Sequence, residues 1–524
     1  MTHFRHLAAA AFLLVLAACA QPRILPTVVE DTGFSHPAVD EVFSAGYEHV
    51  SDKYIEALAL DDIGLEALRG LGAIDPALSI ERADGKIGLY AEGGELIRLK
   101  IPDPATPRAW GRLTTQVAVA ARGWSYEMRK ADPERIYEAV FDGMLSELDI
   151  YSRYSGADEA RRNRARRDGF GGIGLRFRLD DGEIEIIHVT PETPAAQAGL
   201  EEGDVIVSVD GKPMVGLSVR EVSKRLRGPV DSQIRLVYRE GDTKVEREIV
   251  LTRRHIVPQT VTATYSNGIL VVRVSSFNQK TAADVKTAVM KHRRTSGARL
   301  KGMVLDLTGN PGGLLRQSVT LANLFLTQGH IISTRGRHSD SLHQYNADGE
   351  DILQGRPLVV LVDGKSASAS EITASALQDR NRAVVVGTSS YGKGSVQTVI
   401  RLPNDGELTL TWSRLIAPTG YTLHGLGIHP TVCTSSTAFG LNADRVAQAV
   451  SSAAEAIEVF SRWRRPALLT ADERSTLRDL CPPERRKDDA DLSVAKRIIL
   501  EKGLFARALT LTATDTPTAG KDPD

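Results

Sequence analysis

The spacing of apolar residues changes along this chain from a helical period to a strand period. Residues 40–165 carry mainly helical patterns, including two weakly similar segments at 65–75 and 138–149. Short alternating runs of strand type then follow at 175–179, 184–189, 205–209, 234–238 and 245–251. Between the third and fourth of these runs, residues 219–226 have the spacing of an amphipathic helix. The pattern predicts a helical first region followed by a small β-rich domain.

A second rhythm begins near residue 257. Apolar runs at 269–274, 303–307, 358–362 and 383–386 alternate with helical stretches at 281–293, 314–326 and 369–378. Strands that alternate with helices predict an α/β arrangement with parallel strands. Residues 335–356 are polar and are predicted to form a mobile loop. Residues 436–511 are predicted to be helical, and 512–524 are predicted to be a disordered tail.

Composition adds that the chain is globular and not basic. The chain is 42% hydrophobic and 25% charged, as is typical of a globular protein, and its 524 residues are long enough for about three domains. Lys and Arg number 65 against 66 Asp and Glu, so the arginine run 161–167 favours a solvated linker over a nucleic-acid site. Gly169, Gly171 and Gly174 spell a dinucleotide-binding fingerprint. We reject it because the arginine run, not a strand, precedes it and no helix follows.

The strongest chemical signal lies around Ser368. The apolar run 358–363 leads into Ser366-Ala-Ser-Ala-Ser-Glu371 and then into a helical pattern, which puts Ser368 at the first turn of a helix with free backbone N–H groups around it. Lys393 follows between two glycines. A lysine acts as a general base only when it is neutral, which burial or cationic neighbours favour. Taken alone, the serine also fits an ordinary helix cap and the lysine a solvated turn.

A glycine turn precedes this region. The strand run 303–307 leads into Asn310-Pro-Gly-Gly313, whose backbone N–H groups can face a developing oxyanion. The alternative is an ordinary tight turn in which glycine supplies a positive φ.

The stretch Ser366–Gln397 resembles the C-terminal processing peptidases, a family of serine proteases with a PDZ domain. Ser368 and Lys393 are 25 positions apart, and Gln397 follows the lysine by four. The resemblance implies that Ser368 is the nucleophile, Lys393 the general base and Gln397 the residue that positions the lysine. Ser366, Ser370 and Ser395 would be structural.

The same resemblance implies an oxyanion hole and a peptide-binding loop. The N–H groups of Gly313, with Gly312 as the alternative, and of Ala369 would bind the oxyanion, although Thr308 stands where the family usually has arginine. Residues 168–256 resemble a PDZ domain. Its carboxylate-binding loop would consist of Gly172, Ile173, Gly174 and Leu175, with a peptide strand added beside 175–179.

The family resemblance covers about residues 130–432. It implies a multidomain α/β protein with a crotonase/ClpP-like Ser–Lys protease core at 257–435 and an inserted PDZ domain. The helical regions at 19–167 and 436–511 rest on pattern alone. No metal and no cofactor are implied.

The N-terminus indicates the compartment. Arg5 precedes an apolar stretch, 7–18, that is too short to span a membrane core of ~30 Å, so residues 1–18 are predicted to be a signal peptide. Leu16-Ala-Ala-Cys19 resembles the bacterial lipoprotein box, which implies lipidation of Cys19. The alternative is a plain signal peptide cut near Ala20. In an oxidising space, Cys433 and Cys481 are candidates for a disulfide.

Two functional hypotheses follow. The first is a lipid-anchored periplasmic endopeptidase, attached to the outer membrane of a Gram-negative-type bacterium, that captures the free C-termini of protein substrates. An activating adaptor protein is a further candidate partner, and nucleic acid is not. The second hypothesis is a non-catalytic PDZ-containing scaffold on the same fold. The presence of serine, lysine and glutamine at the expected spacing favours the first.

Overall fold

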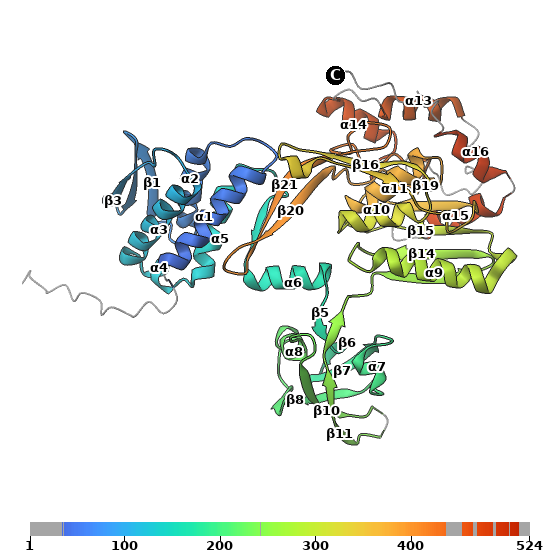
Figure 1. Ribbon diagram of the computed structural model, residues 1–524, viewed down its shortest axis with the longest axis horizontal. Helices are drawn as coiled ribbons and strands as arrows, with labels where there is room; N and C mark the ends of the chain where they lie inside the picture. Colours follow the sequence, from blue (N-terminus) through green and yellow to red (C-terminus); the bar gives the residue numbers. More distant parts are fainter. Residues whose placement is uncertain are drawn as a thin grey trace, which may run out of the picture.

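The computed structural model describes residues 34, 36–241, 243–435, 453–464, 469–485, 489–501 and 503–512. The predicted signal peptide, Cys19 and all but the first residue of the predicted tail lie outside these ranges. Figure 1 shows three bodies: a helical N-terminal domain, a small β-rich domain and an α/β core. None of the helices in the described ranges combines the length and apolar character needed to cross a membrane.

The N-terminal domain is built from helices around an aromatic core. Its main helices are α1 (His36–Lys53), α2 (Leu60–Arg69), α3 (Pro107–Trp124) and α5 (Pro133–Leu145), with the short α4 (Tyr126–Lys130) between the last two. Phe43, Tyr47, Trp110 and Phe141 are fully buried between them.

This domain also contains a sheet that the helical prediction missed. Strands β1 (Leu78–Ala83), β2 (Lys86–Ala91) and β3 (Gly94–Lys100) form an antiparallel meander. Its two hairpins turn at Asp84-Gly85 and Glu92-Gly93, where all four residues have positive φ. Such two-residue turns match the twist of the paired strands.

The arginine run forms a helix rather than a linker. Helix α6 (Ala157–Arg167) follows the short strand β4 (Arg153–Ser155) and leads into the β-rich domain. Arg164 and Arg167 each form an ion pair with the buried carboxylate of Glu407, at 2.9 and 3.0 Å. These pairs fix the helix against the core.

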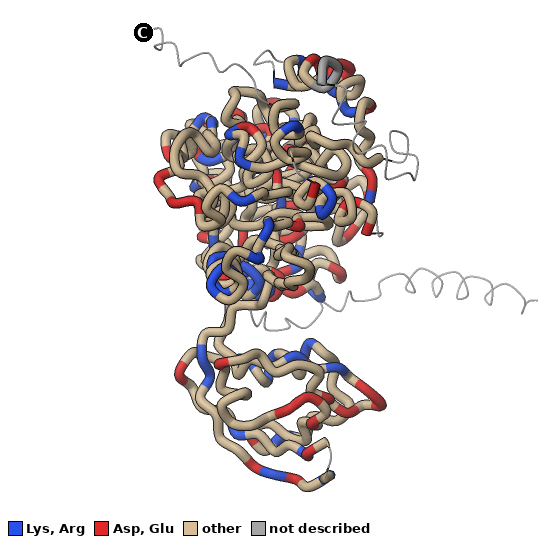
Figure 2. Tube along the Cα trace, turned by 90° about the vertical axis from the view of Figure 1, so that its right-hand side faces the viewer, with Lys and Arg blue, Asp and Glu red and all other residues tan. Residues whose placement is uncertain are grey.

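The β-rich domain hangs from the rest of the molecule by a narrow connection of two chain segments (Figure 2). Strands β5 (Phe170–Gly172) and β12 (Arg254–Ile256) pair at this connection. The remaining strands are β6 (Leu175–Asp180), β7 (Glu183–Val189), β8 (Val205–Val209), β9 (Lys212–Pro213), β10 (Gln233–Arg239) and β11 (Glu246–Thr252). The main sheet order is β11-β10-β8-β7-β6, so β6 is an edge strand. Helices α7 (Pro194–Gln197) and α8 (Val219–Leu226) complete the domain, and α8 matches the predicted range.

The core is a sheet whose parallel strands are buried on both faces. Its order is β13 (Val261–Ser266), β14 (Ile269–Val274), β15 (Gly302–Asp306), β18 (Leu358–Val362), β19 (Val384–Gly387) and β22 (Val432–Cys433). All neighbours after the antiparallel β13–β14 pair are parallel. Side chains alternate between two hydrophobic clusters, one shared with α9 (Thr281–Ser296), α10 (Leu315–Asn323) and α11 (Ala369–Asp379). The other cluster is shared with α15 (Ala490–Leu500) and α16 (Leu504–Thr510). Burial on both faces explains the near-continuous apolar runs in the sequence.

A second sheet joins the core to the N-terminal domain. Its strands are β17 (His343–Ala347), β16 (Gly329–Arg335), β21 (Glu407–Ile416) and β20 (Ser395–Arg401), and β4 pairs with β21. The β20–β21 hairpin reaches the helical domain (Figure 1), where Leu402, Leu408 and Leu410 enter its core. The predicted mobile loop 335–356 instead contains a short 3₁₀ helix (Ser339–Ser341) and β17.

The described segments beyond residue 435 lie against the core. Helices α13 (Ala453–Trp463) and α14 (Ala471–Asp479) precede α15, and a disulfide of 2.05 Å joins Cys433 of β22 to Cys481 just after α14. Part of the predicted helical region 436–511 lies outside the described residues.

Candidate active site

Ser368 lies at the corner between strand β18 and helix α11. Its φ of 55° is in the left-handed region, which is unusual for a residue other than glycine and typical of functional corners. Ser368 is half-buried, while Ala369 and Ser370 behind it are buried. The backbone N–H of Ser368 donates to Glu371 Oε2 at 2.7 Å. The corner therefore presents the Ser368 side chain and anchors its backbone.

The glycine turn lies directly beside this serine. A Cβ on Gly312 would lie 2.9 Å from the Cβ of Ser368, so only glycine permits the approach. The Gly312 N–H is already used, because it donates to Asn310 Oδ1 at 2.8 Å. Gly313 is exposed, and its N–H has no acceptor within the described part of the chain. The N–H of Ala369, at the first position of α11, has no intrahelical acceptor. The N–H groups of Gly313 and Ala369 are thus both without an acceptor in the described structure, and their part in an oxyanion hole stays a prediction.

Thr308 does not leave this turn without support. Its hydroxyl donates to Asp306 Oδ1 at 2.6 Å, and the guanidinium of Arg273 donates to Asp306 Oδ2 at 2.9 Å. Arg273 also reaches the Thr308 carbonyl at 3.4 Å. An arginine on β14 therefore supports the turn in this protein.

Lys393 lies on the loop that leads into β20. Its Nζ is 4.8 Å from the ring centroid of Tyr151, over the ring face. Burial lowers the pKa of Lys393, and Arg153 lowers it further, while Asp149 and Glu371 act in the opposite direction. Gly394 is required for packing, since a Cβ there would lie 2.0 Å from the backbone nitrogen of His424. The site therefore favours the neutral amine that a general base needs.

Glu371 connects the serine to the lysine, and sequence reasoning gave it no role. Its fully buried carboxylate accepts hydrogen bonds from the N–H groups of Ser368, Gly392 and Lys393 at 2.7, 2.7 and 3.0 Å. The hydroxyl of Ser390 donates to it at 2.5 Å. Burial raises the pKa of Glu371, and these hydrogen bonds oppose that shift. The sequence motif Ser368-x-x-Glu371 is that of a helix capping box, and it could have indicated that Glu371 binds the backbone of Ser368.

Gln397 lies on β20, one position after a register shift in the β20–β21 ladder. Its Nε2 donates to Ser395 Oγ at 2.9 Å and to Thr411 Oγ1 at 3.1 Å. In the described structure Gln397 makes no hydrogen bond to Lys393, so its role toward the lysine stays a prediction. Ser395 was expected to be structural, and its hydroxyl accepts this hydrogen bond from Gln397.

The side chains of Ser368 and Lys393 are likewise not hydrogen-bonded to each other in the described structure. Glu371 joins their backbones, and catalytic hydrogen bonds between side chains often tighten only when substrate is bound. Of the other serines, Ser366 donates to the Leu307 carbonyl at 2.9 Å and Ser370 to the Asn310 carbonyl at 3.0 Å. Both hydroxyls are occupied and buried.

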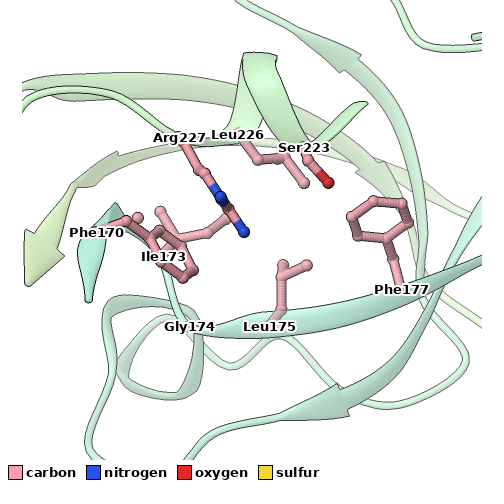
Figure 3. Close-up of a pocket in the computed structure, with 9 residues that line it drawn as sticks. Phe170, Ile173, Gly174, Leu175, Phe177, Ser223, Leu226 and Arg227 are labelled. Atoms are coloured by element: carbon pink, nitrogen blue, oxygen red, sulfur yellow. The ribbon is translucent and has the colours of Figure 1, made fainter. Parts of the chain in front are cut away.

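The β-rich domain contains the predicted peptide-binding groove (Figure 3). The groove is lined by Phe170, Gly172, Ile173, Gly174, Leu175, Phe177, Ser223, Leu226 and Arg227. It therefore lies between β6 and α8 and includes all four predicted loop residues. The guanidinium carbon of Arg227 lies 3.9 Å from the ring centroid of Phe170, at the end of the groove formed by the loop.

Comparison with known proteins agrees with this arrangement. The family model of Peptidase family S41 matches residues 268–434, and a PDZ domain model matches 185–240. A carboxy-terminal-processing protease of Bartonella bacilliformis is 37% identical over 303 residues, which cover 57% of this chain and 70% of that protein. The chain belongs to the carboxy-terminal-processing serine proteases. The predicted fold class, a multidomain α/β protein with an S41 core and a PDZ domain, is confirmed.

Two further relatives of this carboxy-terminal-processing protease differ in how much of their length is matched. A probable CtpA-like serine protease of Staphylococcus haemolyticus is 33% identical over 306 residues, 58% of this chain and 60% of that protein. Among solved structures, the photosystem II D1 C-terminal processing protease is 25% identical with a TM-score of 0.38, covering 78% of this chain and 96% of that one.

Arg478, which lies beyond the residues that match the family model, contacts the loop that leads to Lys393. Arg478 donates to the Leu426 carbonyl at 2.6 Å and to the Ser390 carbonyl at 3.0 Å. Because Ser390 also binds Glu371, Arg478 supports the residue that connects Ser368 to Lys393.

Proposed function

We propose that the protein is a metal-independent endopeptidase in which Ser368 is the nucleophile and Lys393 the general base. The observation that carries this proposal is the buried carboxylate of Glu371, which binds the backbone N–H groups of both residues. The exposed N–H of Gly313 lies on the turn beside the serine. A serine at a helix corner, a lysine with a lowered pKa and an unused N–H on the neighbouring turn support this proposal.

The reaction follows from these positions. The neutral amine of Lys393 takes the proton of Ser368 Oγ as that oxygen attacks the scissile carbonyl carbon. The N–H groups of Gly313 and Ala369 stabilise the oxyanion, a contribution of about 100- to 1,000-fold for one such donor. The ammonium then protonates the leaving amine. Water hydrolyses the acyl-enzyme with the lysine again as base.

Gln397 is proposed to orient the lysine through its amide oxygen. The amide nitrogen is held by Ser395 and Thr411, and no described residue donates to Oε1. That oxygen is free to accept a hydrogen bond from the lysine Nζ.

Substrate selection is proposed to occur in the PDZ groove. β6 is an edge strand, so a peptide can add to it as a further strand. Ile173, Leu175, Phe177 and Leu226 offer an apolar pocket for the last side chain. The loop N–H groups and the cation of Arg227 would bind the terminal carboxylate. The preferred substrate therefore ends in an apolar residue with a free carboxylate.

Peptide binding to the Ser368→Ala protein tests this selection without cleavage. Amidation of the peptide C-terminus should weaken binding by about tenfold or more, because charge-assisted hydrogen bonds contribute about 1.5–3 kcal/mol each. Proline in the last residues of the peptide should also weaken binding, since it removes a donor from the added strand. Equal affinities for the free acid and the amide would contradict C-terminal recognition.

We further propose that the protease is a lipid-anchored periplasmic protein. The Leu16–Cys19 motif and the disulfide between Cys433 and Cys481 support this, because disulfides persist in oxidising compartments. Cys19→Ala should move the protein from the membrane fraction to the soluble periplasmic fraction. Unchanged membrane association of the variant would contradict the anchor.

A further inference from the structure

We propose that Tyr151 is a positioning residue for Lys393. Its ring face holds the lysine amine and stabilises the ammonium that forms when the amine takes the proton of Ser368. This inference rests on the proposed Ser–Lys mechanism and adds a residue to it.

The contact itself is specific. Lys393 Nζ lies 4.8 Å from the centroid of the Tyr151 ring. Within the described part of the chain, Nζ forms neither a hydrogen bond nor an ion pair, so the ring is the partner that the structure gives it. A cation over an aromatic face within about 6 Å of the centroid is attracted by the ring quadrupole.

The turn that carries Tyr151 is held firmly. Asp149 Oδ1 accepts the N–H of Tyr151 at 2.8 Å and the hydroxyl of Thr411 at 2.9 Å, and Oδ2 accepts the hydroxyl of Ser152 at 2.8 Å. The N–H of Thr411 donates in turn to Ser152 Oγ at 3.1 Å. Tyr151 is therefore fixed to strand β21, and Thr411 of that strand also holds Gln397.

The charged groups around Lys393 act on its pKa, whereas the Tyr151 ring is neutral. Burial and Arg153 lower the pKa of Lys393, which favours the neutral amine before attack, while Asp149 and Glu371 oppose this shift. Burial is the larger cause, and the neighbouring Tyr391 the smaller, of a rise in the pKa of Tyr151 to about 12. The phenol therefore stays neutral at working pH. The ring therefore acts on the lysine through its face and brings no formal charge.

The step concerned is the first proton transfer. The O–H bond of Ser368 breaks as Oγ bonds to the carbonyl carbon, the carbonyl π electrons move to oxygen, and the proton goes to Nζ. Positive charge develops at Nζ against the Tyr151 ring. A ring in this place stabilises the transition state and makes the amine a stronger base.

The test compares pH–rate profiles of wild type, Tyr151→Leu and Tyr151→Phe, with Ile150→Ala as the control. Ile150 lies in the same turn and is 85% exposed. In Tyr151→Leu, kcat on the alkaline plateau should fall about three- to thirty-fold. KM should be unchanged and the acid limb should move to lower pH, because the ammonium has lost its partner. Tyr151→Phe should rescue both kcat and the position of the limb.

A second series of variants tests the same role even if Tyr151→Leu does not fold. Phenylalanine with increasing ring fluorination at position 151 keeps the shape and weakens the quadrupole, so kcat should fall stepwise. A flat series, or a leucine variant with the wild-type plateau and acid limb, would overturn the role of Tyr151. Lys393→Ala separates the two claims: if it remains active, the Ser–Lys mechanism itself is wrong.

Discussion

At the scale of single residues, the geometry of the site depends most on the carboxylate of Glu371. Four donors converge on it, from Ser368, Ser390, Gly392 and Lys393. Burying a carboxylate costs free energy, and the four hydrogen bonds to Glu371 together compensate that cost. Its position fixes the distance between the two backbones that carry the proposed nucleophile and the proposed base.

Glu371→Gln is predicted to lower both stability and turnover. An amide nitrogen cannot accept a hydrogen bond, so at least one buried donor loses its acceptor, at a cost of about 1–3 kcal/mol. The melting temperature and kcat on a peptide substrate measure the two effects. Glu473→Gln is the matched control, since Glu473 caps α14 in the same way with Thr470 but is exposed. Wild-type stability and turnover in Glu371→Gln would contradict the proposed role.

Family resemblance in the sequence pointed to Ser368 and Lys393 but not to the group that joins them. Serine, lysine and their separation are visible in the sequence. The importance of Glu371 depends on Gly392 and Ser390 returning to the first turn of α11 from about 20 residues away. The partners of Gln397 could not be predicted for the same reason, because Thr411 lies on the neighbouring strand.

At the scale of elements, helix α6 shows how a distant contact can decide local structure. Its run of arginines favoured a solvated linker. The helix is ordered by Arg164 and Arg167, which bind Glu407 more than 200 residues further along the chain. Four of the six core strands, β14, β15, β18 and β19, were by contrast predicted to within one residue, because strands buried on both faces have nearly continuous apolar sequences. Strands β13 and β22 were not predicted.

Glu407→Gln is predicted to destabilise the junction of α6 and β21. The Glu407 side chain is 4% exposed, and its loss of charge removes a buried counterion from two partly buried guanidinium groups. Breaking such a pair typically costs about 3 kcal/mol or more. The shift in melting temperature measures the loss. Glu248→Gln, which removes an exposed ion pair with Arg235, should change stability by at most about 1 kcal/mol. Equal, small shifts in both variants would show that α6 does not depend on Glu407.

At the scale of the whole molecule, two connections bring distant parts of the chain to the protease core. The β20–β21 hairpin carries Gln397 and inserts Leu408 and Leu410 into the helical domain. The disulfide between Cys433 and Cys481 closes a loop of 48 residues and holds the segment that contains Arg478 against the loop that leads to Lys393. The N-terminal domain and the C-terminal segment therefore both reach the site.

Reduction of the disulfide, or Cys481→Ser, is predicted to lower stability by about 2–4 kcal/mol. It should also lower turnover, because Arg478 then supports Ser390 less firmly. Thermal melting and kcat, each with and without reductant, measure these effects. The double variant Cys433→Ser, Cys481→Ser should match the single variant and should not respond to reductant. A wild-type protein that is indifferent to reductant would contradict this coupling.

The most direct test of the central claim is proteolysis of an unfolded protein substrate by Ser368→Ala. Ser366→Ala and Ser370→Ala serve as controls, since their hydroxyls bond to backbone carbonyls and take no part in the proposed chemistry. Cleavage should be abolished in Ser368→Ala, with a melting temperature close to that of wild type, and should remain measurable in both controls. Undiminished cleavage by Ser368→Ala would contradict the Ser–Lys mechanism.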